Sequence, residues 1–262
     1  MIRILQAHPQ PPAEVGEILD GADGQTDSKR HHRLLTERPA ARPQVVEFLR
    51  EALARHHADA DKRSRVAKIN KALKRQGFPP RSVYPKNDST RKGNLAEIVL
   101  AEYVVASEEI SLPVYRLRHN PNVDQSMKGD DVLAFDLDSK PMRILVGESK
   151  FRGTPRREHV EEIVESLLRS YKAKIPASLQ FVADSLYEER KSDLARRVEA
   201  CQLAIVRGKM DLDYVGLLLG NPSAANCVAK YTPAGQPKRL AMISFGVDAP
   251  NTLVEDCFRD LT

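Results

Sequence analysis

The residues best suited to chemistry lie in two neighbouring segments that have the residue patterns of strands. Asp131 opens the first segment, and Glu148 and Lys150 lie near the end of the second. Because side chains alternate along a strand, Glu148 and Lys150 point to one face, which the apolar Ile144 and Val146 share. That face enters the core, so we expect both charges to be half buried at the mouth of a cleft.

These charges need compensation, because an unpaired charge in a protein interior costs several kcal/mol. A divalent cation would supply it, since the carboxylates of Asp131 and Glu148 are hard oxygen ligands of the kind that Mg²⁺ or Mn²⁺ takes. Such a cation activates a bound water and stabilises the charge that develops during phosphodiester hydrolysis. Lys150 would orient that water or steady that charge. The two segments therefore predict a metal-dependent hydrolase that acts on phosphodiesters.

We expect a third acid from a helix upstream. Residues 94–107 are apolar nearly all round, which is typical of a buried helix, and Glu97 and Glu102 are the only charges in it. Glu97 lies on an apolar stripe and is the favoured third catalytic residue and metal ligand, with Glu102 as the alternative. Asp131 is likewise favoured over the adjacent Asp130 as a ligand, because Asp131 begins the strand.

In this order the residues resemble the PD-(D/E)XK nuclease superfamily. Its pattern is an acid on the first core helix, an Asp at the start of a strand and (D/E)-x-K on the next strand. Here these positions read Glu97, Asp131 and Glu148-Ser149-Lys150, and the resemblance covers roughly residues 93–175. It implies a helix–strand–strand–strand–helix core. The chain departs from the pattern before the aspartate, where Gly129-Asp130 stands in place of a proline.

A closer resemblance is to the HamA proteins of the bacterial Hachiman antiphage system, and to related nucleases encoded beside helicases. The stretches GNLAEIVLAEYV, PVYRLRHNPNVDQSMKGDDVLAF and GESKFR carry it, over most of residues 90–262. The resemblance implies a metal-dependent DNA endonuclease that a large helicase subunit, HamB, holds inactive. Sensing of phage or damaged DNA by the helicase would release the nuclease.

A run of basic residues precedes these motifs. Residues 62–92 hold eleven basic residues and one acid, a net charge of +10 in a chain whose total is +5. Such a run is either a solvated helix face or a phosphate-binding face that releases counterions when it binds a polyanion. Arg152, after the E-x-K motif, either contacts phosphate or is simply exposed. The candidate nucleic-acid-binding residues in the predicted helix from Asp61 to Gln76 are Lys62, Arg63, Arg65, Lys68, Lys71, Lys74 and Arg75.

The patterns predict a mixed α/β chain, and the resemblance to the PD-(D/E)XK superfamily implies a central mixed sheet flanked by helices. Residues 1–90 are expected to form an N-terminal arm and basic helical region, with a strand or arm at Ile2–Gln6, then a loop to residue 42 and a helix from Pro43. Residues 91–262 are expected to form the nuclease-like domain. Its expected strands are 112–118, 131–137, 142–151, 212–219 and 240–247. Its expected later helices are 156–173, 176–190, 192–203 and 251–261.

Composition excludes several other classes. Of the 262 residues, 41% are hydrophobic and 29% charged, which is ordinary for a globular protein. Three cysteines without a CxxC motif argue against a disulfide framework and structural zinc. No stretch approaches the ~20 apolar residues of a membrane span, and the N-terminus lacks a secretory signal, so we expect a cytoplasmic protein.

Two further functions stay open at this stage. The first is a non-catalytic subunit that grips DNA through the basic run and docks a helicase, with a decayed site. The second is cleavage of RNA, because metal chemistry at a phosphodiester does not itself distinguish the two sugars. The absence of a P-loop or GxGxxG motif argues against hydrolysis of nucleoside triphosphates by this chain.

Overall fold

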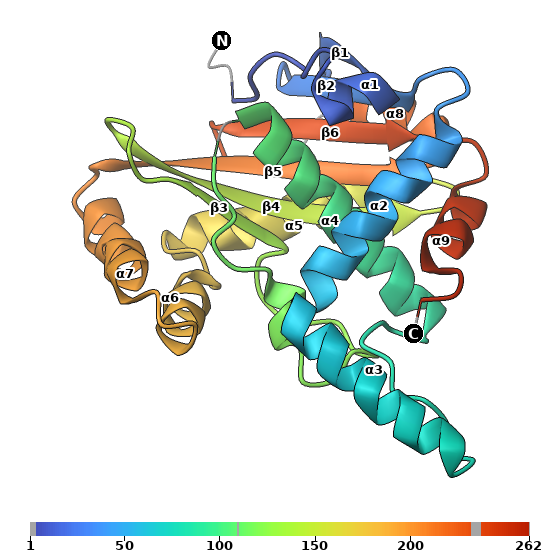
Figure 1. Cartoon of the computed structure of the whole chain (residues 1–262). Helices are drawn as coiled ribbons and strands as arrows, with labels where there is room; N and C mark the ends of the chain where they lie inside the picture. The colour runs from blue at the N-terminus through green and yellow to red at the C-terminus, as the bar shows by residue number, and fades with distance from the viewer. Residues whose placement is uncertain (1–3, 109, 232–236, 262) are drawn as a thin grey trace.

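The computed structural model describes residues 4–108, 110–231 and 237–261. A six-stranded mixed sheet runs through its centre in the order β1-β2-β6-β5-β4-β3 (Figure 1). The strands are β1 (Leu19–Gln25), β2 (His31–Glu37), β3 (Val132–Asp136), β4 (Met142–Arg152), β5 (Met210–Gly220) and β6 (Leu240–Gly246). The four inner strands, β2, β6, β5 and β4, are parallel to one another. The edge strand β1 pairs antiparallel with β2, and the edge strand β3 pairs antiparallel with β4.

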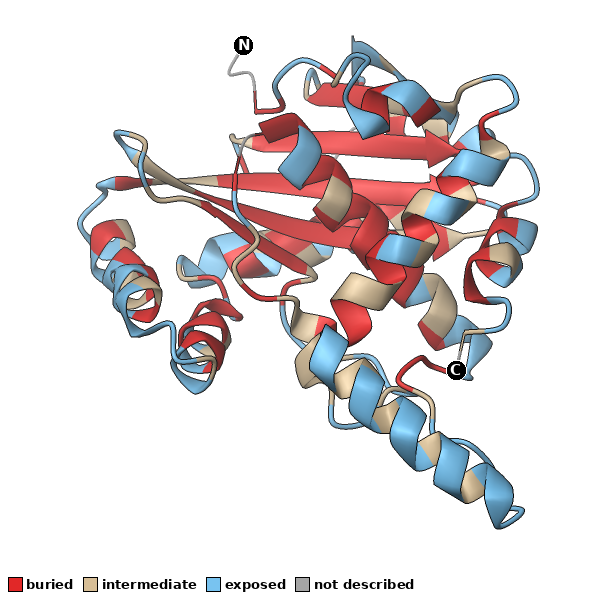
Figure 2. Cartoon of the chain, in the orientation of Figure 1, coloured by how far each residue is buried: buried red, intermediate tan, exposed pale blue. Residues whose placement is uncertain are grey.

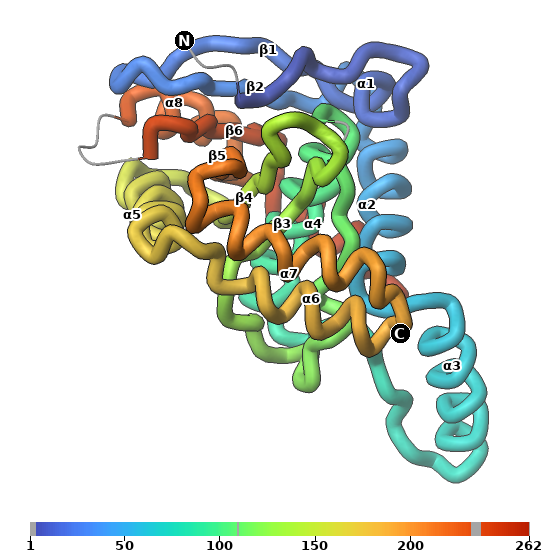
Figure 3. Tube along the Cα trace, turned by 90° about the vertical axis from the view of Figure 1, so that its left-hand side faces the viewer, coloured from blue at the N-terminus to red at the C-terminus, as the bar shows by residue number. Residues whose placement is uncertain are grey.

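Helices cover both faces of this sheet (Figures 1 and 3). The first face carries α1 (Glu14–Ile18), α2 (Arg42–His57), α4 (Asp88–Glu108) and α9 (Pro250–Phe258). The second face carries α5 (Arg157–Ala173), α6 (Leu179–Glu188), α7 (Ser192–Val206) and α8 (Ser223–Ala229). The remaining elements are α3 (Ala60–Arg75) and a short 3₁₀ helix, η1 (Arg116–His119). Helix α3 projects from the body of the molecule (Figure 1).

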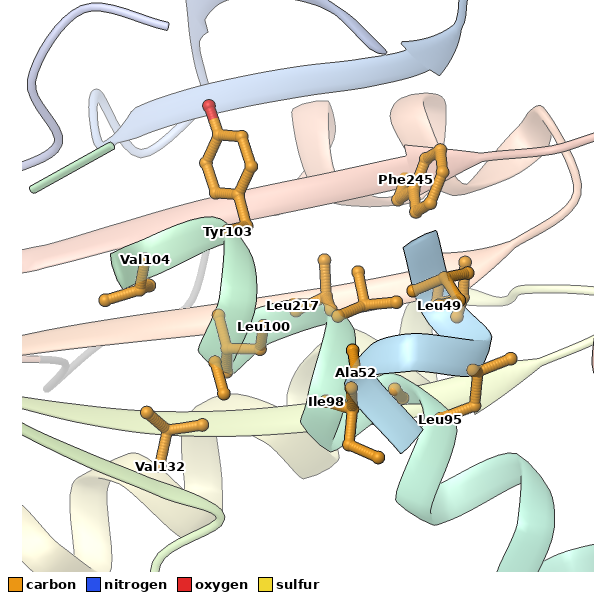
Figure 4. Packing of buried hydrophobic residues seen from close by; sticks show 14 of the residues in the cluster. Leu49, Ala52, Leu95, Ile98, Leu100, Tyr103, Val104, Val132, Leu217 and Phe245 are labelled. Atoms are coloured by element: carbon orange, nitrogen blue, oxygen red, sulfur yellow. The ribbon is translucent and has the colours of Figure 1, made fainter. Parts of the chain in front are cut away.

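The inner strands separate two hydrophobic clusters. Along β4, Leu145 points into the cluster under α4, whereas Ile144 and Val146 point into the cluster under α5. This alternation explains why the inner strands are buried almost throughout, as parallel strands covered on both faces are (Figure 2). Figure 4 shows the first cluster, where Leu95 and Ile98 of α4 and Leu217 of β5 pack together.

The expected mixed sheet flanked by helices is confirmed, while the PD-(D/E)XK core and the division near residue 90 stay predictions. In the described structure, β1 and β2 from residues 1–90 belong to the same sheet as the later strands. Helix α2, also from this part, packs against α4 and α9. Helix α4 begins at Asp88, six residues before the expected start at 94.

The loop expected up to residue 42 is wrong, whereas the expected strand or arm at Ile2–Gln6 lies partly outside the described residues. Residues 19–37, expected as loop, form the hairpin of β1 and β2, and the described part of the expected strand, Ile4–Gln6, is irregular. The carbonyl oxygens of Ile4 and Gln6 accept hydrogen bonds from Arg143 and Arg33, so side chains replace strand partners there.

The strand expected over 112–118 is also wrong. Ser111 forms an isolated bridge to Phe135, and the chain then leaves the sheet edge for η1. It does so because η1 packs on α2, where Arg118 Nε donates to the carbonyl of Arg55 at 2.8 Å. The short helix α8 was not expected. In the described parts of the chain, no helix has the length and hydropathy to cross a membrane.

Candidate functional site

An open cleft of about 680 Å³ lies where α4, α5, β4 and the loop before β3 meet. Glu97, Asp131, Glu148, Lys150 and Arg152 all line it, although 55 positions separate the first from the last along the chain. Other basic side chains on its wall are Lys92, Arg116, Lys128 and Arg169. The cleft thus joins an acidic floor to a basic rim.

Glu148 and Lys150 lie on the α5 face of β4, as strand alternation predicts. Lys150 Nζ is 3.2 Å from Glu148 Oε1, and Ser166 of α5 donates to Oε2 at 3.0 Å. Glu148 is buried, and this burial together with the nearby Asp131 raises its pKa to about 7. Lys150 keeps 31% of its side chain exposed, so its ammonium group can reach a ligand in the cleft.

Asp131 is positioned by the pairing of β3 with β4. Its backbone N–H donates to the carbonyl of Gly147, and its Oδ2 accepts from both the N–H and the hydroxyl of Ser149, each at 2.9 Å. These bonds place the Asp131 carboxylate beside the residue that follows Glu148. The two acids consequently repel each other, since each is a negative charge at the same end of the strand pair.

Glu97 reaches the cluster from α4 because the helix packs closely on β4. At Gly147, a Cβ would lie only 2.9 Å from Leu100 Cδ2 and from Val132 Cβ, so a larger residue would force the helix away. Glu97 is buried, and desolvation raises its pKa to about 8, with contributions from Asp131 and Glu148. Three carboxylates from separate elements therefore share one electrostatic environment.

Arg116 belongs to the acidic cluster although it was not predicted from the sequence, and Lys128 and Arg169 of the cleft wall were not predicted either. Its Nε lies 3.3 Å from Glu97 Oε1 and its Nη1 lies 3.8 Å from Asp131 Oδ1. The guanidinium also donates to the carbonyl oxygens of Asp130 and Met127, which anchors the loop before β3. The only signal in the sequence was a cation inside a presumed strand, so its place in the cluster was not visible.

The two alternatives left open by the sequence lie outside the cleft. Asp130 is buried and accepts from the Ser170 hydroxyl at 2.9 Å and the Ser178 N–H at 3.0 Å, which ties it to α5 and the start of α6. Glu102 contacts α2, with its carboxylate oxygens 2.8 Å from His56 Nε2 and 2.9 Å from Arg55 Nη2. Both carboxylates thus have structural partners away from Glu148.

The residues do not form a ready-made cage for a metal. Within the described residues, no group of three or more His, Cys, Asp or Glu side chains is spaced to hold an ion, and Arg116 lies against Glu97 and Asp131. Mg²⁺ nevertheless fits the donor set, because it is commonly held by one or two carboxylates and takes its other ligands from water and substrate phosphate. Asp131 and Glu148, whose mutual repulsion a cation would relieve, are the pair that would hold it.

The predicted nucleic-acid-binding residues fall into three groups. Arg152 lines the cleft and pairs with Glu162 at 2.9 Å. Lys62 and Arg63, at the start of α3, donate to backbone carbonyls, so they anchor the helix to the body. The exposed group on α3 comprises Arg65, Lys68, Lys71, Lys74 and Arg75.

Comparison with known proteins gives one consistent result. A family model described as HamA matches residues 15–261. A Bacillus cereus protein described as Hachiman protein HamA is 33% identical over 244 residues, which cover 92% of this chain and 88% of the relative. The similarity therefore extends over the cleft, α3 and the sheet together.

Proposed function

Because the chain belongs to the HamA family, we propose that it is the nuclease subunit of a Hachiman antiphage defence system. Its proposed activity is the Mg²⁺- or Mn²⁺-dependent hydrolysis of phosphodiester bonds in DNA. The observation that carries this proposal is the meeting of Glu97, Asp131, Glu148 and Lys150 in one cleft.

Each residue has a distinct part in the proposed reaction. Asp131 and Glu148 would hold the divalent cation, which when bound activates the attacking water and offsets charge on the phosphate. Lys150, with an ammonium group that reaches the cleft, stabilises the charge that builds on the phosphate oxygens or orients the water. Glu97 completes the acidic floor, and Arg116 pairs with Glu97 and fixes the loop that carries Asp131.

The surroundings of the cleft support a polyanionic substrate. Its rim carries Lys92, Lys128 and Arg169, and α3 adds a row of exposed lysines and arginines outside it. We propose DNA as the substrate and a HamB-like helicase as the partner that holds and activates the nuclease in the cytoplasm, both on the basis of family membership.

A second function has its own support. The protein would be a DNA-binding subunit that docks a helicase without cutting, if the acidic site had lost its metal. The observation that favours it is Arg116, whose guanidinium compensates Glu97 and Asp131 without a metal ion. Under this alternative, the basic residues matter for function and Glu148 does not.

A double variant, Glu148→Ala with Lys150→Ala, separates the two functions. If the chain is a nuclease, the variant loses DNA cleavage and protection of cells from phage but still binds DNA, because α3 is unchanged. Undiminished protection by the double variant would support the docking subunit. The control is Glu162→Ala, which removes an exposed acid that pairs with Arg152 outside the acidic cluster.

A further inference from the structure

Helix α3 and the segment that returns from it form a basic arm, which we define as residues 60–85. None of the α3 side chains is buried, and the arm extends away from the sheet (Figures 1 and 2). At 1.5 Å per residue, the 16-residue helix is about 24 Å long, the length of about seven base pairs. Because so little of α3 packs against the rest of the protein, packing does not explain why the helix projects, and a binding role would.

A large apolar ring marks the tip of this arm. Phe78 is 62% exposed, which makes it the most exposed aromatic side chain among the large exposed hydrophobic residues of the described chain. It follows Gly77, whose φ of +74° lets the chain reverse direction after α3. Arg75 and Arg81, both exposed, flank the ring in sequence. An exposed ring among cations is poorly suited to an apolar partner surface and well suited to a nucleobase beside phosphates.

The tip is held in a defined shape. The N–H of Phe78 donates to the carbonyl of Leu73, and the side chain of Asn70 exchanges two hydrogen bonds with the backbone of Arg81, each of 2.8 Å. The ring is therefore presented by a folded turn. Binding would not have to order the turn first, which reduces the entropic cost of contact.

The arm leads directly to the cleft. Its returning segment ends at residue 85, and Asp124 then accepts from the N–H groups of Lys86 and Asn87 at 2.5 and 3.2 Å. Ser89 and Lys92, a few residues on, line the cleft itself. At its other end, Lys62 donates to the carbonyl of Arg118 in η1, the 3₁₀ helix that carries Arg116. A nucleic-acid strand bound along the arm would thus reach the acidic cluster in the cleft.

We propose that the basic arm grips single-stranded DNA, with Phe78 stacked on an unpaired base and the cations of α3 along the phosphates. The choice of DNA rests on the proposed function, whereas the stacking and charge contacts do not require cleavage. Ring stacking and phosphate contact are separable, because only the latter depends on salt.

The test uses the absence of tryptophan from the chain. Phe78→Trp in the full chain provides a single tryptophan, whose emission is excited selectively over that of tyrosine. The protein is titrated with a single-stranded 20-mer in EDTA so that no cleavage occurs. The matched control is Leu203→Trp on α7, a residue that is 59% exposed and distant from the arm in sequence. Heparin supplies a polyanion without bases. Affinity of the Phe78→Ala variant is measured in parallel over a range of salt concentrations.

We expect DNA to quench the emission of Trp at position 78, but not at position 203, and heparin to quench neither. Phe78→Ala should weaken binding about 5- to 150-fold, with an unchanged salt slope. Unaltered emission on binding, equal quenching by heparin, or undiminished affinity of Phe78→Ala would overturn the proposal. If the emission of Trp at position 78 shifted to shorter wavelength only when a protein partner was added, the tip would be a protein-docking site instead. Failure of the nuclease proposal would show separately, as absent cleavage with Mg²⁺ while quenching in EDTA persists.

Discussion

Arg116 and Glu97 form a buried ion pair at the floor of the cleft, with Nε 3.3 Å from Oε1 and side chains only 11% and 8% exposed. The pair joins η1 to α4, and Nη1 of the same guanidinium lies 3.8 Å from Asp131 Oδ1. The guanidinium therefore compensates Glu97 and Asp131 when no metal is bound, while Lys150 lies against Glu148. A divalent cation would add to this compensation at Asp131 and Glu148.

Loss of Arg116 should be costly. At pH 9, above the raised pKa of Glu97 of about 8, Arg116→Met leaves the ionised Glu97 and Asp131 without their cation, and breaking a buried pair in this way costs about 3–5 kcal/mol of unfolding free energy. Urea unfolding in EDTA measures the loss. Adding Glu97→Gln to the variant should recover part of it, because the uncompensated charge is then gone.

An exposed pair provides the control for this experiment. Arg157→Met removes the partner of Glu161, whose ion pair lies on the surface of α5, and should cost no more than about 1 kcal/mol. If Arg116→Met and Arg157→Met were equally mild, Arg116 would have no role in compensating the cluster.

Glu148→Gln should make the metal-free protein more stable and abolish its response to metal. Burial and Asp131 raise the pKa of Glu148 to about 7, so at pH 8 the ionised carboxylate destabilises the fold. The neutral amide should raise the unfolding free energy by about 1 kcal/mol in EDTA. Thermal unfolding with and without Mg²⁺ tests both effects. Glu162→Gln should retain the rise in melting temperature with Mg²⁺, and a retained rise in Glu148→Gln would exclude Glu148 as a ligand.

Neutral substitutions on α3 should change the salt dependence of DNA binding. Replacing Lys68, Lys71 and Lys74 by Ala should weaken binding and lower the slope of log affinity against log salt by about 1 for each lost phosphate contact. Fluorescence anisotropy between 50 and 200 mM salt, about the range over which such contacts act, gives the slope. Ala at the exposed Lys172, Lys209 and Lys230 is the matched control. Equal slopes for the two variants would make α3 an ordinary solvated helix.

His57 should make the protein less stable in acid. Its Nδ1 donates to the Leu53 carbonyl and its Nε2 accepts from Asn94, between the rings of Tyr84 and Phe258. Burial, with the charges of His56 and Lys62, lowers its pKa to about 4. The unfolded chain therefore binds more protons between about pH 6.5 and 4, so unfolding free energy falls as pH drops through this range, by up to about 3 kcal/mol. His57→Gln should flatten that fall in urea titrations; an unchanged slope would contradict this.

Local patterns were sufficient to predict the elements that carry the acids and the lysine. Alternation identified β4 to within one residue and placed Glu148 and Lys150 on one face. The apolar stripe of α4 distinguished Glu97, which lines the cleft, from Glu102, which contacts α2. These inferences succeeded because periodicity is a short-range property of the chain.

Features that depend on distant contacts were not predictable. Strand β1, LDGADGQ, has little strand propensity and forms because β2 pairs with it and with β6, some 200 residues later. The fully buried Arg33 is tolerated in β2 because Asp23, the Tyr103 hydroxyl and the Gln6 carbonyl accept its hydrogen bonds. The position of Arg116 likewise depends on distant residues, because its partners are Glu97 on α4 and Asp131 before β3.

Cleavage of plasmid DNA by the purified protein tests the central claim most directly. Wild type, Glu148→Gln and Glu162→Gln are each incubated with Mg²⁺ or EDTA, alone and with the helicase subunit of the same system. The account predicts Mg²⁺-dependent cutting by wild type and Glu162→Gln, at least with the helicase present, and none by Glu148→Gln. Equal cutting by Glu148→Gln, or no cutting by wild type under any of these conditions while DNA still binds, would contradict it.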